Sequence, residues 1–369
     1  MKIKTITCHD VYNAGASLQA YALQHYLQQC GHDVEIIDYK PDYLSGHYKF
    51  SLINTPRYNK PFIRELYLFA HFPQRFRAYV EGKKQRFDQF KSEYLIITKK
   101  RYHSFDELRD MPPEAECFIA GSDQIWNPYL PNGSDPSFYL QFTPDNVRRI
   151  SFAASFATDA LPDEKKQMVK TWLTRMDSIS VREKSGLNIL AEMGIKGTAV
   201  CDPVFLLEKE EWKELAVHRL NEKPYILVYD FENNEIIQTI ALNLAKRKNT
   251  EVVSVLPVKN KTIKTARAVG PREFLSLILF SEAVVSNSFH AVAFSLIFHK
   301  EMFVLKRNEN LNARMIDLLG DVGLQDRLVN DWAGCDVLHK INWDAVDRVL
   351  EKKIENSKMF LTVVVEGGK

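Results

Sequence analysis

The segment with the clearest capacity for proton transfer is Ser288-Phe289-His290, which separates the apolar run 283–285 from the largely apolar run 291–298. Serine caps helix N-termini, so the pattern predicts a strand followed at once by a helix with His290 in its first turn. Because this helix is apolar on most faces it must be buried, and its histidine then points into a cleft. The helix dipole favours neutral His290, a base, whereas a bound dianion would favour the protonated acid. From these residues alone, a structural histidine bonded to a nearby carbonyl is the alternative.

A second polar group, Ser122, Asp123, Gln124 and Trp126, directly follows the predicted strand 117–120. A carboxylate with amide donors and an aromatic face is typical of sugar binding. The alternative is a polar turn with no ligand.

The first predicted strand-to-helix junction contains Asn13 and Gly15, ahead of a helix over 18–30. A short glycine-containing loop lets backbone approach an anion or a sugar. The further glycines of a dinucleotide fingerprint and the GKS or GKT of a phosphate loop are missing, which disfavours both cofactor motifs. A simple structural turn is the alternative.

Positive charge follows other predicted strands. Arg182 ends the strand 178–181, and its guanidinium fork suits a phosphate or carboxylate. Its alternative is an ion pair with Glu183 or Asp202. Lys306 and Arg314 follow the strand 302–305, where they can add charge to the same cleft or lie in a solvated loop.

The elements that must position these residues alternate between strands and helices, which predicts an α/β fold with two Rossmann-like parallel-sheet domains. We place the N-terminal domain at 1–210, with an aromatic and basic insertion at about 40–110 that covers a sheet edge and contains a helix at 74–94. The C-terminal domain spans 211–343, and a last helix over 344–369 packs back on the N-terminal domain. In such folds ligands bind beyond the carboxyl ends of the strands.

Composition excludes several function classes. Of 369 residues, 49 are Lys or Arg and 47 are Asp or Glu, so the net charge of +2 indicates neither a nucleic-acid nor a membrane surface. No apolar run is long enough to span a membrane. The 5 cysteines are scattered, and no cluster has metal-ligand spacing. These features predict a cytoplasmic protein without metal, cofactor or integral membrane segment.

Several short motifs occur in a recognisable order from about residue 5 to 320. They are Asn13-x-Gly15, Gly121-Ser122-Asp123-Gln124-Ile125-Trp126-Asn127, Ser151-Phe152-Ala153-Ala154-Ser155-Phe156, Ser180-Val181-Arg182-Glu183, Asp202-Pro203 and Ser288-Phe289-His290. In these motifs the chain resembles the polysaccharide pyruvyl transferase family. It departs from the usual pattern at Ala291, where the family commonly has Gly, and at Ala16, where some branches have Asp.

The resemblance implies a GT-B-like pair of domains facing a cleft, with the acceptor on the N-terminal side and the donor on the C-terminal side. It also implies transfer of pyruvate from phosphoenolpyruvate to a sugar of a cell-surface glycan or exopolysaccharide, usually as a ketal, with release of phosphate. The partners would be phosphoenolpyruvate and an oligosaccharide or lipid-linked glycan. No cofactor is required.

Residue roles follow from that chemistry. Arg182, Arg314 and Lys306, with the N–H groups near Ser288, would hold the phosphate and carboxylate of the donor. His290 would transfer a proton. Asp123, from the opposite domain, would orient or deprotonate the acceptor.

Two alternatives to this function stay open. A GT-B nucleotide-sugar glycosyltransferase would need an acidic residue at the ribose, and the nearest candidates, Glu282 and Glu301, stand at unsuitable ends of elements. A non-catalytic glycan- or anion-binding protein is the other, and Ala291 is its one hint.

Overall fold

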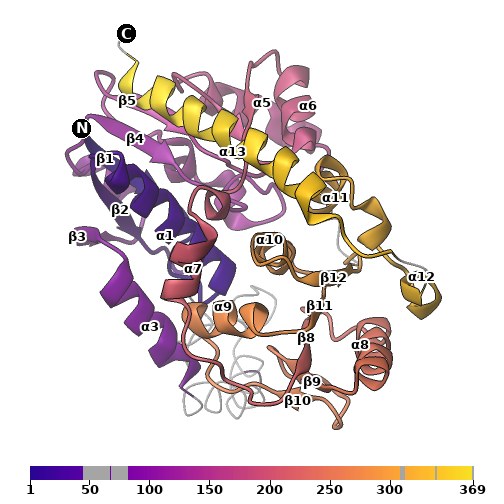
Figure 1. Ribbon diagram of the computed structural model, residues 1–369. Helices are drawn as coiled ribbons and strands as arrows, with labels where there is room; N and C mark the ends of the chain where they lie inside the picture. Colours follow the sequence, from indigo (N-terminus) through magenta and orange to yellow (C-terminus); the bar gives the residue numbers. More distant parts are fainter. Residues whose placement is uncertain (45–66, 68–81, 308–311, 337–338, 368–369) are drawn as a thin grey trace.

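The protein folds into two α/β units, each a parallel sheet covered by helices (Figure 1). This description rests on a computed structural model that describes residues 1–44, 67, 82–307, 312–336 and 339–367. The predicted fold class is confirmed: all pairings within both main sheets are parallel.

The N-terminal domain contains a five-stranded sheet in the order β3-β2-β1-β4-β5. Its strands are β1 (Lys2–Ile6), β2 (Asp33–Tyr39), β3 (Ile97–Tyr102), β4 (Cys117–Ala120) and β5 (Arg148–Ser151). Its helices are α1 (Ala14–Gln29), α3 (Lys83–Tyr94), α4 (Phe105–Asp110), α5 (Asp163–Leu173) and α6 (Lys184–Glu192), with short 3-10 turns η3 (Pro131–Ser134) and η4 (Pro136–Tyr139). Single bridges from the β5 side continue the sheet into the short pair β6 (Ser180–Val181) and β7 (Thr198–Ala199).

The C-terminal domain repeats this order as β10-β9-β8-β11-β12. Its strands are β8 (Tyr225–Tyr229), β9 (Glu251–Ser254), β10 (Lys264–Thr265), β11 (Ala283–Ser286) and β12 (Glu301–Val304). Its helices are α8 (Glu235–Lys248), α9 (Pro271–Leu279), α10 (Phe289–Ile297), α11 (Ala313–Asp321) and α12 (Trp332–Asp336), with the 3-10 turn η6 (Gln325–Arg327). Strands β8 and β11 are buried along their whole length, as expected for parallel strands with helices on both faces.

In both sheets the first strand of the domain lies between its second and fourth strands. In the N-terminal sheet, the connections that follow β1 and β4 run to opposite sides of the sheet, and those that follow β8 and β11 do the same in the C-terminal sheet. This reversal of direction opens a crevice at the carboxyl ends of these strands. The chain segments that follow these four strands include the predicted junctions at Asn13, Ser122 and Ser288. The fold therefore brings the polar junctions of both domains to facing edges.

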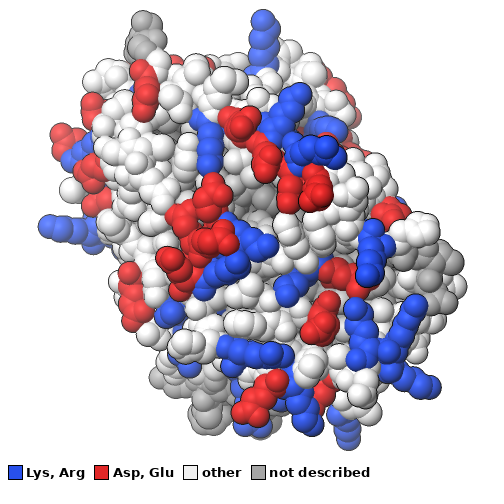
Figure 2. Space-filling view, in the orientation of Figure 1, with Lys and Arg blue, Asp and Glu red and all other residues white. Residues whose placement is uncertain are grey.

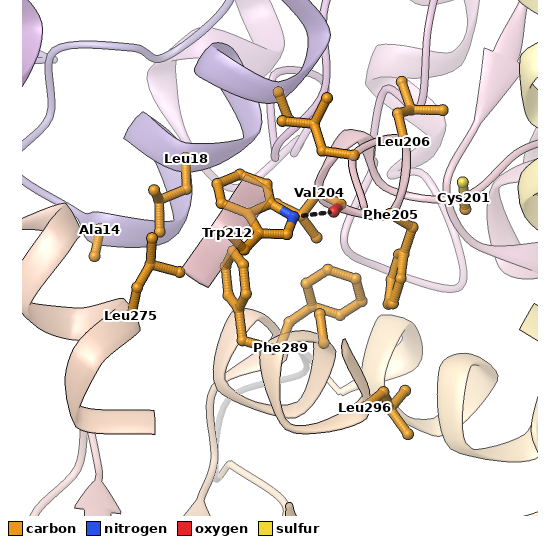
Figure 3. Close-up of a cluster of buried hydrophobic side chains, with 14 of the residues drawn as sticks. Ala14, Leu18, Cys201, Val204, Phe205, Leu206, Trp212, Leu275, Phe289 and Leu296 are labelled. Atoms are coloured by element: carbon orange, nitrogen blue, oxygen red, sulfur yellow. Dashed lines mark hydrogen bonds between the residues drawn. The ribbon is translucent and has the colours of Figure 1, made fainter. Parts of the chain in front are cut away.

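The two domains share one apolar core. η5 (Pro203–Phe205) and α7 (Lys209–Leu215) connect the domains. Trp212 of α7 is fully buried, with its ring 5.0 Å from that of Phe294 on α10 and its indole N–H donating to the carbonyl of Val204 at 3.0 Å. Around it lie Leu18 of α1 and Leu275 of α9 (Figure 3).

Helix α13 (Trp343–Glu366) crosses both domains, as the yellow ribbon of Figure 1 shows. At its start, Asp347 is 2.9 Å from the imidazole of His299 in the C-terminal domain. Farther along, Ser357 accepts a hydrogen bond from the Cys201 N–H at 2.9 Å, and Arg148 of β5 donates to the carbonyl of Val364 at 2.9 Å. The helix thus ties the C-terminal domain to the N-terminal sheet.

Strand β3 lies inside the segment 40–110, for which we expected an insertion at the sheet edge. It pairs with β2 as an edge strand and exposes Lys99, Lys100 and Arg101. Charged side chains are a common feature of edge strands, and they hide the apolar alternation that a sequence reading needs. Of the helix expected at 74–94, α3 accounts for the later part, and 74–81 lie outside the described residues, as do the aromatic and basic residues at 45–66.

Basic and acidic side chains are mixed over the face drawn in Figure 2, in keeping with the near-zero net charge. Among the described residues, no helix combines the length and apolar character needed to cross a membrane.

Candidate active site

A pocket of about 490 Å³ opens between the two domains at the carboxyl ends of the strands. Its volume is within the range of small-molecule sites. The N-terminal domain contributes Cys8, Val11, Asn13, Tyr43, Leu44, Asp123, Gln124, Leu130, Pro131 and Asn132. The C-terminal domain contributes Phe231, Asn287, Ser288, Phe289, His290, Arg307, Arg314 and Met315.

His290 occupies the first turn of α10. Ser288 is the N-cap, and its hydroxyl accepts a hydrogen bond from the Ala291 N–H at 3.4 Å. The N–H groups of Phe289 and His290 have no acceptor among the described residues, as is usual at a helix start. This helix end is therefore ready to bind an anion.

The imidazole of His290 reaches across the domain boundary to α1. It lies so close to Gly15 that a Cβ on that residue would be 2.1 Å from His290 Nδ1. Asn13 caps α1 by accepting from the Gly15 N–H at 2.9 Å. The sequence led us to expect an anion or a sugar close to the backbone at Gly15. In the structure the side chain of His290, from the other domain, takes that place.

Asp202 lies behind His290 and links several elements. Its carboxylate pairs with the Arg182 guanidinium, accepts from the Ser122 hydroxyl at 3.1 Å and is 3.8 Å from His290 Nε2. Its other oxygen accepts from the Val204 N–H at 3.1 Å and so caps η5. All of these contacts are buried, which makes the carboxylate a fixed negative charge beside the imidazole.

Burial and charge set the protonation states of this cluster. Burial lowers the pKa of His290 to about 4, although the Asp202 carboxylate opposes the shift. Burial acts to raise the pKa of Asp202, but Arg182 and His290 outweigh it, and the pKa is lowered. At neutral pH the site therefore holds an anionic Asp202 beside a neutral His290.

Two arginines flank the ring of Phe289. The guanidinium carbon of Arg182 is 4.6 Å from the ring centroid, and that of Arg314, from α11, is 5.6 Å from it. Arg182 is neutralised by Asp202, whereas Arg314 forms no ion pair with any described carboxylate and its Nε has no hydrogen-bond partner there. Burial, followed by the charge of Arg182, lowers the pKa of Arg314 to about 10. A buried cation without a counter-ion is costly, and a bound anion would remove that cost.

Asp123 approaches the same place from the N-terminal domain. Its backbone has φ of 78°, a left-handed conformation that is uncommon outside glycine and concentrates at functional sites. Its carbonyl accepts from the Ser155 N–H at 3.1 Å, which holds the turn, and its carboxylate lies 3.8 Å from Arg182 Nη2 and lines the pocket.

Comparison with known proteins identifies the chain. The model of the polysaccharide pyruvyl transferase family matches residues 13–309. The chain belongs to this family. It is therefore a transferase, and the GSDQ-x-W-N and SFH motifs on which the resemblance rested lie within the matched region.

Solved structures resemble the chain in fold. MnaA from S. aureus, solved with UDP, is 11% identical with a TM-score of 0.55, and the match covers 99% of this chain and 96% of that one. The UDP-GlcNAc 2-epimerase of Methanocaldococcus jannaschii, solved with UDP-GlcNAc and UDP, is 13% identical with a TM-score of 0.53 over 100% of both chains. At this identity the likeness establishes the GT-B-like fold alone. No curated protein matches the sequence.

Most of the residues singled out in the sequence converge on this pocket. His290, Ser288, Arg314, Asp123, Asn13 and Gln124 line it. Arg182, Ser122 and Gly15 lie directly behind the lining residues, through Asp202 and His290.

Two predicted site residues and one substituted position lie elsewhere. Trp126 is fully buried, donates its indole N–H to the Phe138 carbonyl at 3.0 Å, and does not line the pocket. Lys306 is exposed outside the lining. Ala291, where the family usually has Gly, is buried and does not line the pocket.

The sequence reading missed the central place of Asp202, which it named as an ion-pair partner of Arg182, and it did not count Asn287 or Phe231 among the site residues. Asn287 donates to Asp230 at 2.7 Å and accepts from the Phe231 N–H at 3.1 Å, which joins the loops after β8 and β11. Their positions in the sequence could have indicated these residues, because Asp202, Asn287 and Phe231 all follow the end of a strand. Among the described residues, no group of His, Cys, Asp or Glu could hold a metal ion.

Proposed function

We propose that this protein transfers pyruvate from phosphoenolpyruvate to a hydroxyl-bearing sugar of a glycan and releases phosphate. The observation that carries the proposal is the buried Arg314 guanidinium, which lines the pocket without a described counter-ion beside the open N-terminus of α10. Phosphoenolpyruvate is small and carries both a phosphate and a carboxylate, so it supplies the negative charge that this end of the pocket requires.

The proton transfers suit His290 and Asp123. Addition of a proton to the methylene carbon of the donor makes its central carbon electrophilic, and the acceptor oxygen then bonds to that carbon as it loses its own proton. For a ketal, a second hydroxyl displaces the phosphate, so one diol and one donor yield one ketal and one phosphate.

Free His290 is neutral, and an adjacent dianion, together with Asp202 at 3.8 Å, favours its protonated form. It then serves as the acid, an effect of about 10²–10⁴-fold. Asp123, on the opposite wall, is the base for the acceptor hydroxyl.

The test measures inorganic phosphate released from phosphoenolpyruvate in the presence of a panel of oligosaccharides. We expect release that depends on both substrates, and its loss in His290→Ala. The matched control is His103→Ala, because His103 is exposed and does not line the pocket. Normal turnover by His290→Ala would remove this histidine from the mechanism.

Ligand-induced stabilisation separates the alternatives. Phosphoenolpyruvate at 100 times its Kd should add about 2.7 kcal/mol to the free energy of unfolding. Stabilisation by UDP-sugars alone, with release of UDP in the presence of an acceptor, would instead favour a glycosyltransferase. Binding of phosphoenolpyruvate without turnover of any acceptor would favour a binding protein.

A further inference from the structure

Helix α11 carries two carboxylates on the same side as Arg314. Arg314, Asp317 and Asp321 follow one another at the i, i+3, i+7 spacing of a single helical stripe. Arg314 lines the pocket, whereas the two carboxylates do not. Because a short helix moves as one unit, contacts that fix the carboxylates also fix Arg314.

Both carboxylates contact Lys184, the first residue of α6 in the N-terminal domain. Asp317 accepts a hydrogen bond from the Lys184 backbone N–H at 2.8 Å, and the Asp321 carboxylate is 2.6 Å from Lys184 Nζ. Lys353 of α13 also pairs with Asp321. These contacts join α11 to α6 of the other domain and to α13. We call Lys184, Asp317 and Asp321 the α6–α11 clamp.

The start of α6 depends on the carboxylate from the other domain. Glu183 is the N-cap residue of α6, but its side chain makes no capping hydrogen bond. Its carboxylate instead accepts from the Ser155 hydroxyl at 2.9 Å and from the Ala157 N–H at 3.0 Å. The N–H groups at a helix start attract negative charge, and here Asp317 supplies it. The clamp therefore satisfies a group that α6 leaves open.

The packing of α11 on this side is incomplete. A cavity of about 20 Å³, room for about one water molecule, adjoins the pocket, since Phe289 and Arg314 line both. Its other lining residues include Arg182, Asp202, Asp317, Asp321 and Lys353. A void offers no atoms to contact, so the polar contacts at Lys184 contribute more to the position of this helix face.

We propose that Asp317 and Asp321 are positioning residues, which hold α11 against Lys184 and thereby keep the Arg314 guanidinium at the base of the pocket. The inference rests on the proposed function for the identity of the anion and goes beyond it, because it makes anion affinity depend on two carboxylates outside the pocket. By linkage, an anion bound at Arg314 strengthens the clamp by the same factor.

The sign of the effect separates positioning from charge. Removal of a carboxylate near a cationic site would, by charge alone, tighten the binding of an anion. If the clamp positions Arg314, its loss weakens binding instead, because the guanidinium no longer stays where the anion needs it.

The test compares Asp317→Ala and Asp321→Asn with Asp317→Asn, whose side-chain oxygen can still accept from the Lys184 N–H. The matched control is Asp326→Asn, because Asp326 is a half-exposed carboxylate of the C-terminal domain outside the clamp. The Kd for phosphoenolpyruvate is measured by calorimetry. The Nε–H resonance of Arg314 in the free protein, assigned by its loss in Arg314→Met, reports the position of the guanidinium, and thermal unfolding verifies the fold.

We expect Asp317→Ala and Asp321→Asn to shift the Arg314 resonance and to raise the Kd by about three- to thirtyfold. Asp317→Asn and Asp326→Asn should both stay close to wild type. An unchanged Arg314 resonance in Asp317→Ala and Asp321→Asn, tighter binding by these variants, or an equal loss in Asp326→Asn would each overturn the proposal. If the wild-type protein does not bind phosphoenolpyruvate, the proposed function fails, whereas the Arg314 resonance of the free protein still decides the positioning role.

Discussion

The imidazole of His290 lies against the backbone of Gly15, at a place where any side chain on residue 15 would overlap it. The two residues belong to different domains, so the position of the histidine depends on the packing of α10 against α1. The proposed proton-transfer group, His290, is therefore itself part of the interface between the two domains.

Gly15→Ala should displace the His290 ring and lower kcat by about 10²-fold, because small misplacements of a reacting group are costly. The affinity for phosphoenolpyruvate should fall less, since Arg314 is untouched. Gly320→Ala is the control, because the nearest atom to its new Cβ would be 3.8 Å away. Turnover equal to wild type in Gly15→Ala would show that the ring does not need its observed position.

Arg314→Met should abolish stabilisation by phosphoenolpyruvate without lowering the stability of the free protein. The guanidinium is buried and has no described counter-ion, so an apolar side chain of similar length removes a cost of burial. Thermal unfolding with and without phosphoenolpyruvate measures both effects. A variant that unfolds at lower temperature yet still responds to the ligand contradicts this assignment.

Asp202→Asn should lower the free energy of unfolding by about 3–5 kcal/mol, because it takes away the nearest carboxylate from the buried Arg182 charge. Urea unfolding measures the change. Asp326→Asn, at a half-exposed carboxylate, should change stability by less than about 1 kcal/mol. If the two substitutions changed the free energy of unfolding by similar amounts, the buried ion pair would contribute no more to stability than an exposed one.

The pKa of His290 is about 4 in the folded protein and 6.5 in a model peptide, so the unfolded chain binds the proton more readily. This histidine therefore contributes stability that is complete above pH 6.5 and is lost as the pH falls through 4. A dianionic ligand raises its pKa, so binding should take up protons and tighten as the pH falls toward 4. Histidine NMR titrations with and without phosphoenolpyruvate test both statements, and a free pKa near 6.5 would refute them.

Much of the fold could be predicted because local patterns and global topology agree. Alternating apolar strands and helices require parallel sheets, and the capping residues Asn13 and Ser288 stand at helix starts as their types predict. Strand β3 was missed because exposed Lys99, Lys100 and Arg101 interrupt its apolar alternation. Edge strands need fewer apolar residues, so their sequence signal is weaker.

Residue type and position relative to strand ends were also enough to predict that Asp123, His290 and Arg314 lie at the site, and all three line the pocket. The same reasoning could not separate Trp126, which packs in the core, from Phe231, which reaches the pocket, because both follow strand ends. Burial depends on what the rest of the chain places over a side chain.

The amino-acid sequence alone determined the α/β class, the family and the junctions at which chemistry can occur, because these depend on periodicity and residue type along the chain. Only the tertiary structure decided that Asp202 neutralises Arg182 and leaves Arg314 without a described counter-ion, and that His290 rests on Gly15. These relations join residues far apart in the chain, and the packing of two domains against each other sets their distances.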